Sequence, residues 1–198
     1  MPAKVVSQAM RSYYDDRAGE YDDWWLGTGL FASRDRPGWP QAVAELVALV
    51  AALPPARVLD VACGTGFLTR HLRGEVTALD QSARMVALAG ARVLQGDAVP
   101  LPFADGEFER VFTGHFYGHL LPGERERFLA QARRVAPALV VVDSARREGA
   151  STEEWQTRTL DDGAVHRVYK RFFDAGELAA ELGGEVLLAS RWFVAVAA

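Results

Sequence analysis

Runs of aliphatic and β-branched residues alternate with amphipathic segments from about residue 53 to the end of the chain. This alternation predicts repeated strand–helix units, which form a largely parallel sheet covered by helices on both faces. The pattern places strands at residues 57–61, 75–79, 91–95, 109–113, 138–143, 165–172 and 185–196. It places the linking helices at residues 67–73, 82–89, 122–135 and 175–182.

The C-terminal end of the chain departs from this alternation. Gly183 and Gly184 leave room only for a tight turn before the last strand, and no crossover helix comes after Val196. Parallel neighbours need a long crossover connection, whereas antiparallel neighbours can be joined by a short turn. We therefore expect the last strand to run antiparallel to the others.

The N-terminal quarter of the chain is predicted to be helical. Two helices, residues 5–25 and 39–53, are separated by a loop that contains Gly and Pro. No composition break separates these helices from the rest of the chain, so we treat residues 1–198 as one domain. Within it, residues 1–53 are expected to cap a core of residues 54–198.

The first predicted helix has an aromatic face. Spacings of four, seven and four residues bring together Met10, Tyr14, Tyr21 and Trp25. Such a stripe is typical of packing against a core. The acidic side chains between residues 15 and 23 are expected to form a solvated face.

Composition narrows the function classes. The 198 residues are 49% hydrophobic and carry a formal charge of −4, with no Lys or Arg run longer than two, which argues against a nucleic-acid partner. The longest apolar stretch, residues 42–53, is too short to span a bilayer, so no membrane partner is expected. Cys63 is the single cysteine and residues 1–8 lack a signal-peptide core, so we expect a reducing, cytoplasmic location. With these partners disfavoured, we expect a small-molecule substrate.

A glycine-containing turn comes after the first predicted strand. That strand ends at Asp60, and the segment Ala62-Cys63-Gly64-Thr65-Gly66 leads into the next predicted helix. Glycine lets backbone amides approach a ligand closely. Dinucleotide-binding proteins share such a turn, but they place a third glycine where this chain has Thr69.

Acidic residues mark the ends of the next two strands. Asp80 ends the second strand, sixteen residues after Gly64, where a carboxylate can accept both hydroxyls of an adenosyl ribose. The third strand gives way to Gly96-Asp97-Ala98, which can hydrogen-bond an adenine edge. In an open α/β sheet these positions converge outside the carboxyl ends of the strands.

Taken in order, these segments resemble the class I S-adenosylmethionine (SAM)-dependent methyltransferases over most of the chain. The residues that carry the resemblance are Leu59 to Gly66, Asp80-Gln81-Ser82 with Met85, Gly96-Asp97-Ala98, and Leu101 to Glu109. The resemblance implies a Rossmann-like three-layer α/β sandwich, with a seven-stranded, mostly parallel sheet, an antiparallel last strand and an N-terminal helical lid. Within the family, Leu101-Pro102-Phe103 and the short length are similar to the quinone-ring and small-metabolite group.

The same resemblance implies a SAM site. The loop from Ala62 to Gly66 would hold the methionine part of SAM, Asp80 the ribose, and Met85, Asp97 and Ala98 the adenine. An N-terminal lid would bring Tyr21 or Trp25 near the sulfonium and Arg36 near the carboxylate. The full expected set is Tyr21, Trp25, Asp60, Ala62, Cys63, Gly64, Gly66, Asp80, Gln81, Met85, Gly96, Asp97, Ala98 and Thr113. The chain departs from the family at Ala62, often Gly, and at Glu109, often Asp.

The segment after the fourth strand, residues 113–119, is expected to face the methyl group and the acceptor. It has no acidic residue, Asn or Pro, and therefore lacks the motif of an acidic or Asn residue, two prolines and an aromatic residue that family members methylating nucleic-acid amines carry here. His115 and His119 are candidate catalytic bases, because a neutral imidazole can take a proton as the methyl group arrives. Packing is the alternative for both. Their spacing of four is that of a metal pair, but Gly114 and Gly118 weaken a helix here, so no metal is expected.

The leading prediction is methyl transfer from SAM to a small-molecule acceptor by in-line displacement. The sulfonium is already a good leaving group, so alignment can dominate the rate. A SAM-binding regulatory module without catalysis and a nicotinamide-dependent oxidoreductase remain as alternatives.

Overall fold

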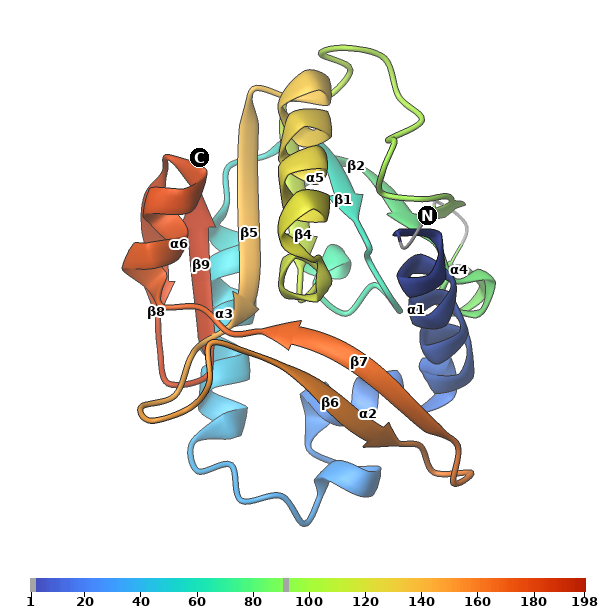
Figure 1. Ribbon diagram of the computed structural model, residues 1–198. Helices are drawn as coiled ribbons and strands as arrows, with labels where there is room; N and C mark the ends of the chain where they lie inside the picture. Colours follow the sequence, from blue (N-terminus) through green and yellow to red (C-terminus); the bar gives the residue numbers. More distant parts are fainter. Residues whose placement is uncertain (1–2, 91–92) are drawn as a thin grey trace.

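The fold is built on one large sheet. A computed structural model describes residues 3–90 and 93–198, and Figure 1 shows its sheet between helices. Seven strands lie in the order β3-β2-β1-β4-β5-β9-β8, and β9 runs antiparallel to both of its neighbours. The bounds are β1 Ala56–Val61, β2 Gly74–Asp80, β3 Val93–Gln95, β4 Arg110–Gly114, β5 Ala138–Ser144, β8 Glu185–Ala189 and β9 Phe193–Ala197. The predicted three-layer α/β sandwich with an antiparallel last strand is confirmed.

Helices cover both faces of this sheet, as the alternation predicts. α5 (Pro122–Val135) and α6 (Ala175–Leu182) lie on one face, and α3 (Trp39–Ala52) lies on the other. Successive residues of β1 serve the two layers, since Leu59 packs in the cluster that contains Phe128 of α5, whereas Val58 packs in the cluster that contains Leu46 of α3. All four side chains are fully buried. Two cores on opposite faces therefore hold the strand ends in place.

The prediction of a helix at residues 67–73 is wrong. Only a 3-10 turn, Thr69–His71, forms there. The Thr69 hydroxyl donates a hydrogen bond to the Asp60 carboxylate at 2.6 Å, which keeps the segment close to the end of β1.

The strand predictions near the C-terminus need correction. β7 (Val165–Arg171) is outside the main sheet and pairs with β6 (Glu153–Thr159), which the pattern missed because its alternation is mostly polar. The strand expected at 185–196 is the β8–β9 hairpin, whose second strand takes the place beside β5. The sheet thus has seven strands, but not the seven predicted. Of the strand expected at 91–95, residues 91–92 lie outside the described residues.

The long N-terminal helix expected over residues 5–25 is broken. It consists of α1 (Ala3–Arg17), a 3-10 turn at Ala18–Glu20 and α2 (Tyr21–Leu26). Gly19 lies at the break, where a glycine weakens a helix. The turn changes the direction of the chain, so the aromatic face divides. None of the helices in the described part of the chain combines the length and apolar character needed to cross a membrane.

The acidic residues of this segment are not simply solvated. The Ser82 hydroxyl donates to Asp15 at 2.6 Å, and the Thr65 hydroxyl donates to Asp22 at 2.5 Å. α1 and α2 are thereby attached to α4 (Ala83–Ala89) and to the glycine loop. The division of the chain into a cap of residues 1–53 and a core of residues 54–198 stays a prediction.

Packing of α3 on the sheet is open to a direct test. Leu46→Ala leaves a cavity between helix and sheet, so we expect a loss of about 2–5 kcal/mol in the free energy of unfolding. The control Leu88→Ala, at a side chain that is 57% exposed, should change it by less than about 0.5 kcal/mol. Urea unfolding followed by circular dichroism measures both, and equal losses would contradict this packing.

Candidate functional site

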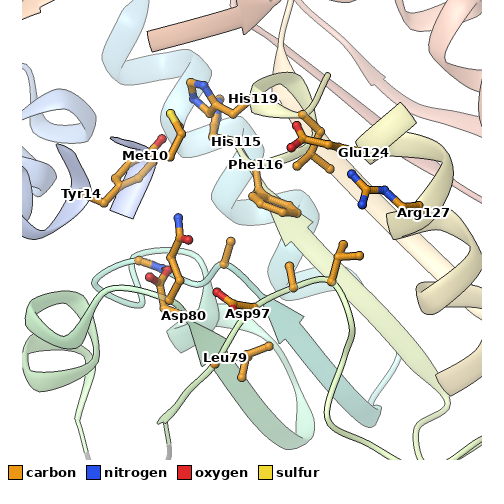
Figure 2. A pocket seen from close by; sticks show the side chains of 18 of the residues that line it. Met10, Tyr14, Leu79, Asp80, Asp97, His115, Phe116, His119, Glu124 and Arg127 are labelled. Carbon is orange, nitrogen blue, oxygen red and sulfur yellow. The ribbon is translucent and has the colours of Figure 1, made fainter. Parts of the chain in front are cut away.

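A pocket of about 320 Å³ opens where β1, β2 and β4 end. Figure 2 shows Met10 and Tyr14 of α1 facing Asp80 and Asp97 across it, with His115 and His119 at the far side. Helix α1 therefore forms one wall of the pocket and the strand ends form the other. Parallel strands end on the same side of the sheet, which explains why residues so distant in sequence meet here.

One carboxylate organises the floor of this pocket. The amides of Gly64 and Ser82 each donate to Asp80 at 2.8 Å, so the glycine loop and the start of α4 share an acceptor. The Ser82 hydroxyl in turn accepts from the Met85 amide and caps α4. Burial raises the pKa of Asp80, and the amide hydrogen bonds oppose that rise.

The glycine loop has little space above it. Gly64 has a φ of +58°, and a Cβ there would lie 3.1 Å from Cε1 of the Tyr21 ring. Ala62 has the same positive φ of 58° despite its side chain. That conformation costs about 1–2 kcal/mol for an L-residue other than glycine. The departure from the usual glycine therefore adds strain to the loop and leaves its path unchanged.

Asp60 lies behind the loop. One of its oxygens accepts from Thr69, and the other is buried without a hydrogen-bond partner among the described residues. Burial raises the pKa of Asp60 to about 7, the Thr69 hydrogen bond lowers it, and the charge of Asp80 raises it further. The Trp25 indole nitrogen is also buried without a partner there, and both side chains line a small cavity with Cys63.

The predicted cofactor and catalytic residues divide into three groups. Ten predicted site residues line the pocket: Tyr21, Ala62, Gly64, Asp80, Gln81, Gly96, Asp97, Ala98, His115 and His119. Trp25, Asp60 and Cys63 line the small cavity behind it instead. Asp97 is half exposed and forms an ion pair with Arg11 of α1 at 2.7 Å.

Three predicted contacts do not reach either space. Met85 of α4 is fully buried. The Thr113 hydroxyl donates to the Val61 carbonyl at 2.8 Å and joins β4 to β1. Gly66 serves the turn of the loop with a φ of +79°. The side chains of Met85 and Thr113 therefore belong to the core, and Gly66 belongs to the turn.

Several lining residues were missed by sequence reasoning. They are Met10, Tyr14, Leu79, Val99, Leu120, Glu124 and Arg127, whereas Gly114 and Phe116 belong to the segment 113–119 that the sequence predicts to face the acceptor. Met10 and Tyr14 belong to the predicted aromatic face, for which the sequence favours core packing over a lid on the site. The break after α1 explains the difference, because it leaves Met10, Tyr14 and Tyr21 toward the pocket and Trp25 stacked on Phe67 at 4.6 Å.

The two histidines are buried and neutral. Burial lowers the pKa of His115 to about 3, although the nearby charge of Asp143 opposes this, and burial lowers the pKa of His119 well below its usual value. His119 Nδ1 lies 2.7 Å from the Tyr169 carbonyl oxygen, to which it donates. A proton acceptor with a pKa near 3 is a weak general base at neutral pH.

Asp143 fixes the position of residues 115–119, which contain both histidines. Its carboxylate accepts from the Gly118 amide at 2.7 Å and forms a buried ion pair with Lys170 of β7. A Cβ on Gly118 would lie 2.6 Å from the Arg171 carbonyl oxygen, so only glycine fits there. In the described part of the chain no three His, Cys, Asp or Glu side chains could hold a metal ion.

A second, larger pocket of about 800 Å³ adjoins the first. It lies between the N-terminal helices, the β6–β7 ribbon and the end of β5. Four residues line both spaces: Tyr14, Tyr21, His115 and His119. The two pockets therefore meet across an aromatic and imidazole boundary.

Comparisons with known proteins agree with this geometry. Residues 59–137 match the family model described as a methyltransferase domain. A demethylmenaquinone methyltransferase of Thermotoga maritima is 34% identical over 145 residues, which cover 68% of this chain and 59% of that protein. The chain spans about half the length of the curated relatives that it matches.

Two solved structures match over nearly the whole chain. A DhpI complex with SAM and HEP is 28% identical with a TM-score of 0.79, covering 100% of this chain and 99% of that one. A DhpI complex with SAH is 31% identical with a TM-score of 0.73, covering 96% and 94%. The N-terminal helices are thus included in the likeness.

The buried state of His115 predicts an acid-sensitive fold. Unfolded His115 takes up a proton below pH 6.5, whereas the folded side chain stays neutral down to about pH 3, so stability falls as the pH falls through this window. The variant His115→Asn is suitable because asparagine tolerates the positive φ at this position. It should reduce the slope of unfolding free energy against pH by up to about 1.4 kcal/mol per pH unit. Urea unfolding at pH 7, 6 and 5 measures it.

His71→Asn, at a less buried histidine, is the matched control and should change the slope less. Wild-type and His115→Asn curves that stay parallel over this pH range would contradict a neutral, buried His115.

Proposed function

Because the chain belongs to the class I SAM-dependent methyltransferases, we propose that it transfers the methyl group of SAM to a small-molecule acceptor. The observation that carries this proposal is the arrangement around Asp80. The buried carboxylate of Asp80, the glycine-loop residues Ala62 and Gly64, and the segment Gly96-Asp97-Ala98 line one pocket. We expect Asp80 to accept the ribose hydroxyls and residues 96–98 to contact the adenine.

The residues present fit the amino-acid end of SAM as well. Asp60 has one buried oxygen without a partner in the described chain, next to the cavity behind the glycine loop. An ammonium group would satisfy such an oxygen and favour its charged form. We propose that Asp60 and the backbone of residues 62–66 hold this end.

SAM supplies an electrophilic methyl group on a positive sulfur. The chain's own residues would bind SAM, orient it toward the acceptor and exclude water. The Tyr21 ring lies over Gly64, where its face can attract a sulfonium. Burial raises the pKa of Tyr21, so its phenol stays neutral at physiological pH. Helices α1 and α2 close the pocket, and desolvation of this kind strengthens electrostatic interactions.

The acceptor is proposed to occupy the second pocket. That pocket reaches Tyr14, Tyr21, His115 and His119, the residues it shares with the proposed SAM site. The formal charge of −4 supports a small molecule over a nucleic acid. The single free Cys63 supports a reducing, cytoplasmic location.

Ligand-dependent thermal stability tests this function. SAM and SAH should each raise the melting temperature, and NAD should not, because only a ligand that binds the folded state stabilises it. Stabilisation by NAD alone would favour the oxidoreductase, and no effect of SAM or SAH would overturn the proposal. Release of SAH with an acceptor panel then separates an enzyme from a SAM-binding regulatory module.

Asp80→Ala should weaken SAH binding by at least about tenfold, because it removes the proposed ribose acceptor and the partner of the Gly64 amide. Glu75→Ala, at an exposed position near the start of the same strand, is the control and should bind as the wild type does. Calorimetric titration measures both. Equal affinities for the two variants would contradict the role of Asp80.

A further inference from the structure

The second pocket carries an unusual concentration of positive charge. Six basic side chains line it: Arg17, Arg34, Arg36, Arg147, Arg158 and Lys170. The acids that line it are Glu20 and Asp35, and the carboxylate of Glu20 already accepts from the Asp161 amide. Lys170 is paired with Asp143, which leaves the arginines as the source of excess charge.

Two of these arginines converge on one hydroxyl group. Arg17 of α1 donates to the Tyr13 oxygen at 2.9 Å, and Arg158 of β6 donates to the same oxygen at 3.0 Å. Arg158 also donates twice to the Gln156 side chain. The guanidinium of Arg17 lies 4.9 Å from the centre of the Tyr21 ring, close to the boundary between the pockets.

Neither arginine has a carboxylate partner within 4.0 Å among the described residues. Arg17 is only 6% exposed and Arg158 is partly buried. The buried Arg125, by contrast, is paired with Glu181 at 3.3 Å. A desolvated charge without a partner is costly in a folded protein. An anionic ligand would supply the missing counter-charge.

The neighbouring side chains strengthen this positive field. Burial and then the charges of Arg158 and Arg17 lower the pKa of Arg34. Arg36 donates to the Trp24 carbonyl oxygen at 3.0 Å and stacks on the Trp39 ring, so its position is fixed without a carboxylate. The arginines thus come from α1, from the loop before α3, from the segment between β5 and β6, and from β6 itself (Figure 1).

We propose that the second pocket binds the methyl acceptor through an anionic oxyacid group, a carboxylate or a phosphoryl group, with Arg17 and Arg158 as its counter-charges. This deepens the proposed function and rests on it. Guanidinium groups suit these anions because their paired N–H donors match two oxygens at once.

An oxyanion also fits the chemistry of the boundary residues. Its oxygen arrives deprotonated, so a lone pair can form the new O–C bond while the electrons of the breaking S–C bond stay on sulfur. The acceptor loses one negative charge and the sulfonium its positive charge, the products are a methyl ester and SAH, and no proton has to be removed. His115 and His119, buried and neutral, then need only to line the path.

Binding to the SAH-loaded protein tests the proposal without turnover. The probes are acetate, malonate, inorganic phosphate and methylphosphonate, with neutral acetamide for comparison. Quenching of Trp24 and Trp39, which line the pocket, reports occupancy. We expect the carboxylates or the phosphoryl compounds to bind at least about tenfold more tightly than acetamide, and the better class identifies the group. Equal weak binding of all five would overturn the proposal.

Variants then assign the charges. Arg17→Gln and Arg158→Gln should each weaken anion binding by at least about tenfold, while Arg158→Lys retains part of it. Arg167→Gln, exposed on the same ribbon, is the matched control. If Arg158 holds a ligand, its removal should leave the melting temperature of the ligand-free protein unchanged or higher, whereas a structural arginine would lower it. A lower melting temperature with intact anion binding would contradict the assignment.

SAH titration of the same variants separates the two hypotheses. Normal SAH binding with no preference for anions would overturn the acceptor class and leave methyl transfer standing. Failure of the wild-type protein to bind SAH would overturn the proposed function itself.

Discussion

The hydrogen bonds between the Asp80 carboxylate and the amides of Gly64 and Ser82 are the constraint on which this site depends. They join the end of β2 to the loop after β1 and to the first turn of α4. A buried carboxylate satisfied by backbone amides holds its surroundings to one geometry, because any other would leave a buried polar group unpaired. The pocket floor is therefore formed before any ligand binds.

The N-terminal helices are bound to the same two segments, the glycine loop and the start of α4. Ser82, whose amide is held by Asp80, donates its hydroxyl proton to Asp15 of α1, and Thr65 of the loop donates to Asp22 of α2. These contacts place the Tyr21 ring over Gly64 and bring Arg17 to the boundary of the two pockets. The strand ends thus position one pocket directly, and through α1 they position Arg17 of the other.

The sequence predicted the parts of this arrangement that have a short-range or periodic signal. The end of β1 at Val61, next to Asp60, the end of β2 at Asp80, the glycine loop and the extent of α5 are encoded in local pattern. The pattern could not show that Met10 and Tyr14 face a pocket, because a break at residues 18–20 decides this. Nor could it identify Arg158, since β6 is a polar ribbon whose partner, β7, was expected in the main sheet. The approach of Arg158 to Tyr13, 145 residues away, leaves no local signal.

Two pockets meet at Tyr14, Tyr21, His115 and His119, and we propose that one holds SAM and the other its acceptor. A crystal structure of the complex with SAH tests it most directly. We predict ribose hydroxyls within hydrogen-bond distance of Asp80, with the Gly64 amide still bound to that carboxylate, and the SAH sulfur beside Tyr21 and His115. SAH bound with its sulfur away from these residues, or without contact to Asp80, would contradict the account.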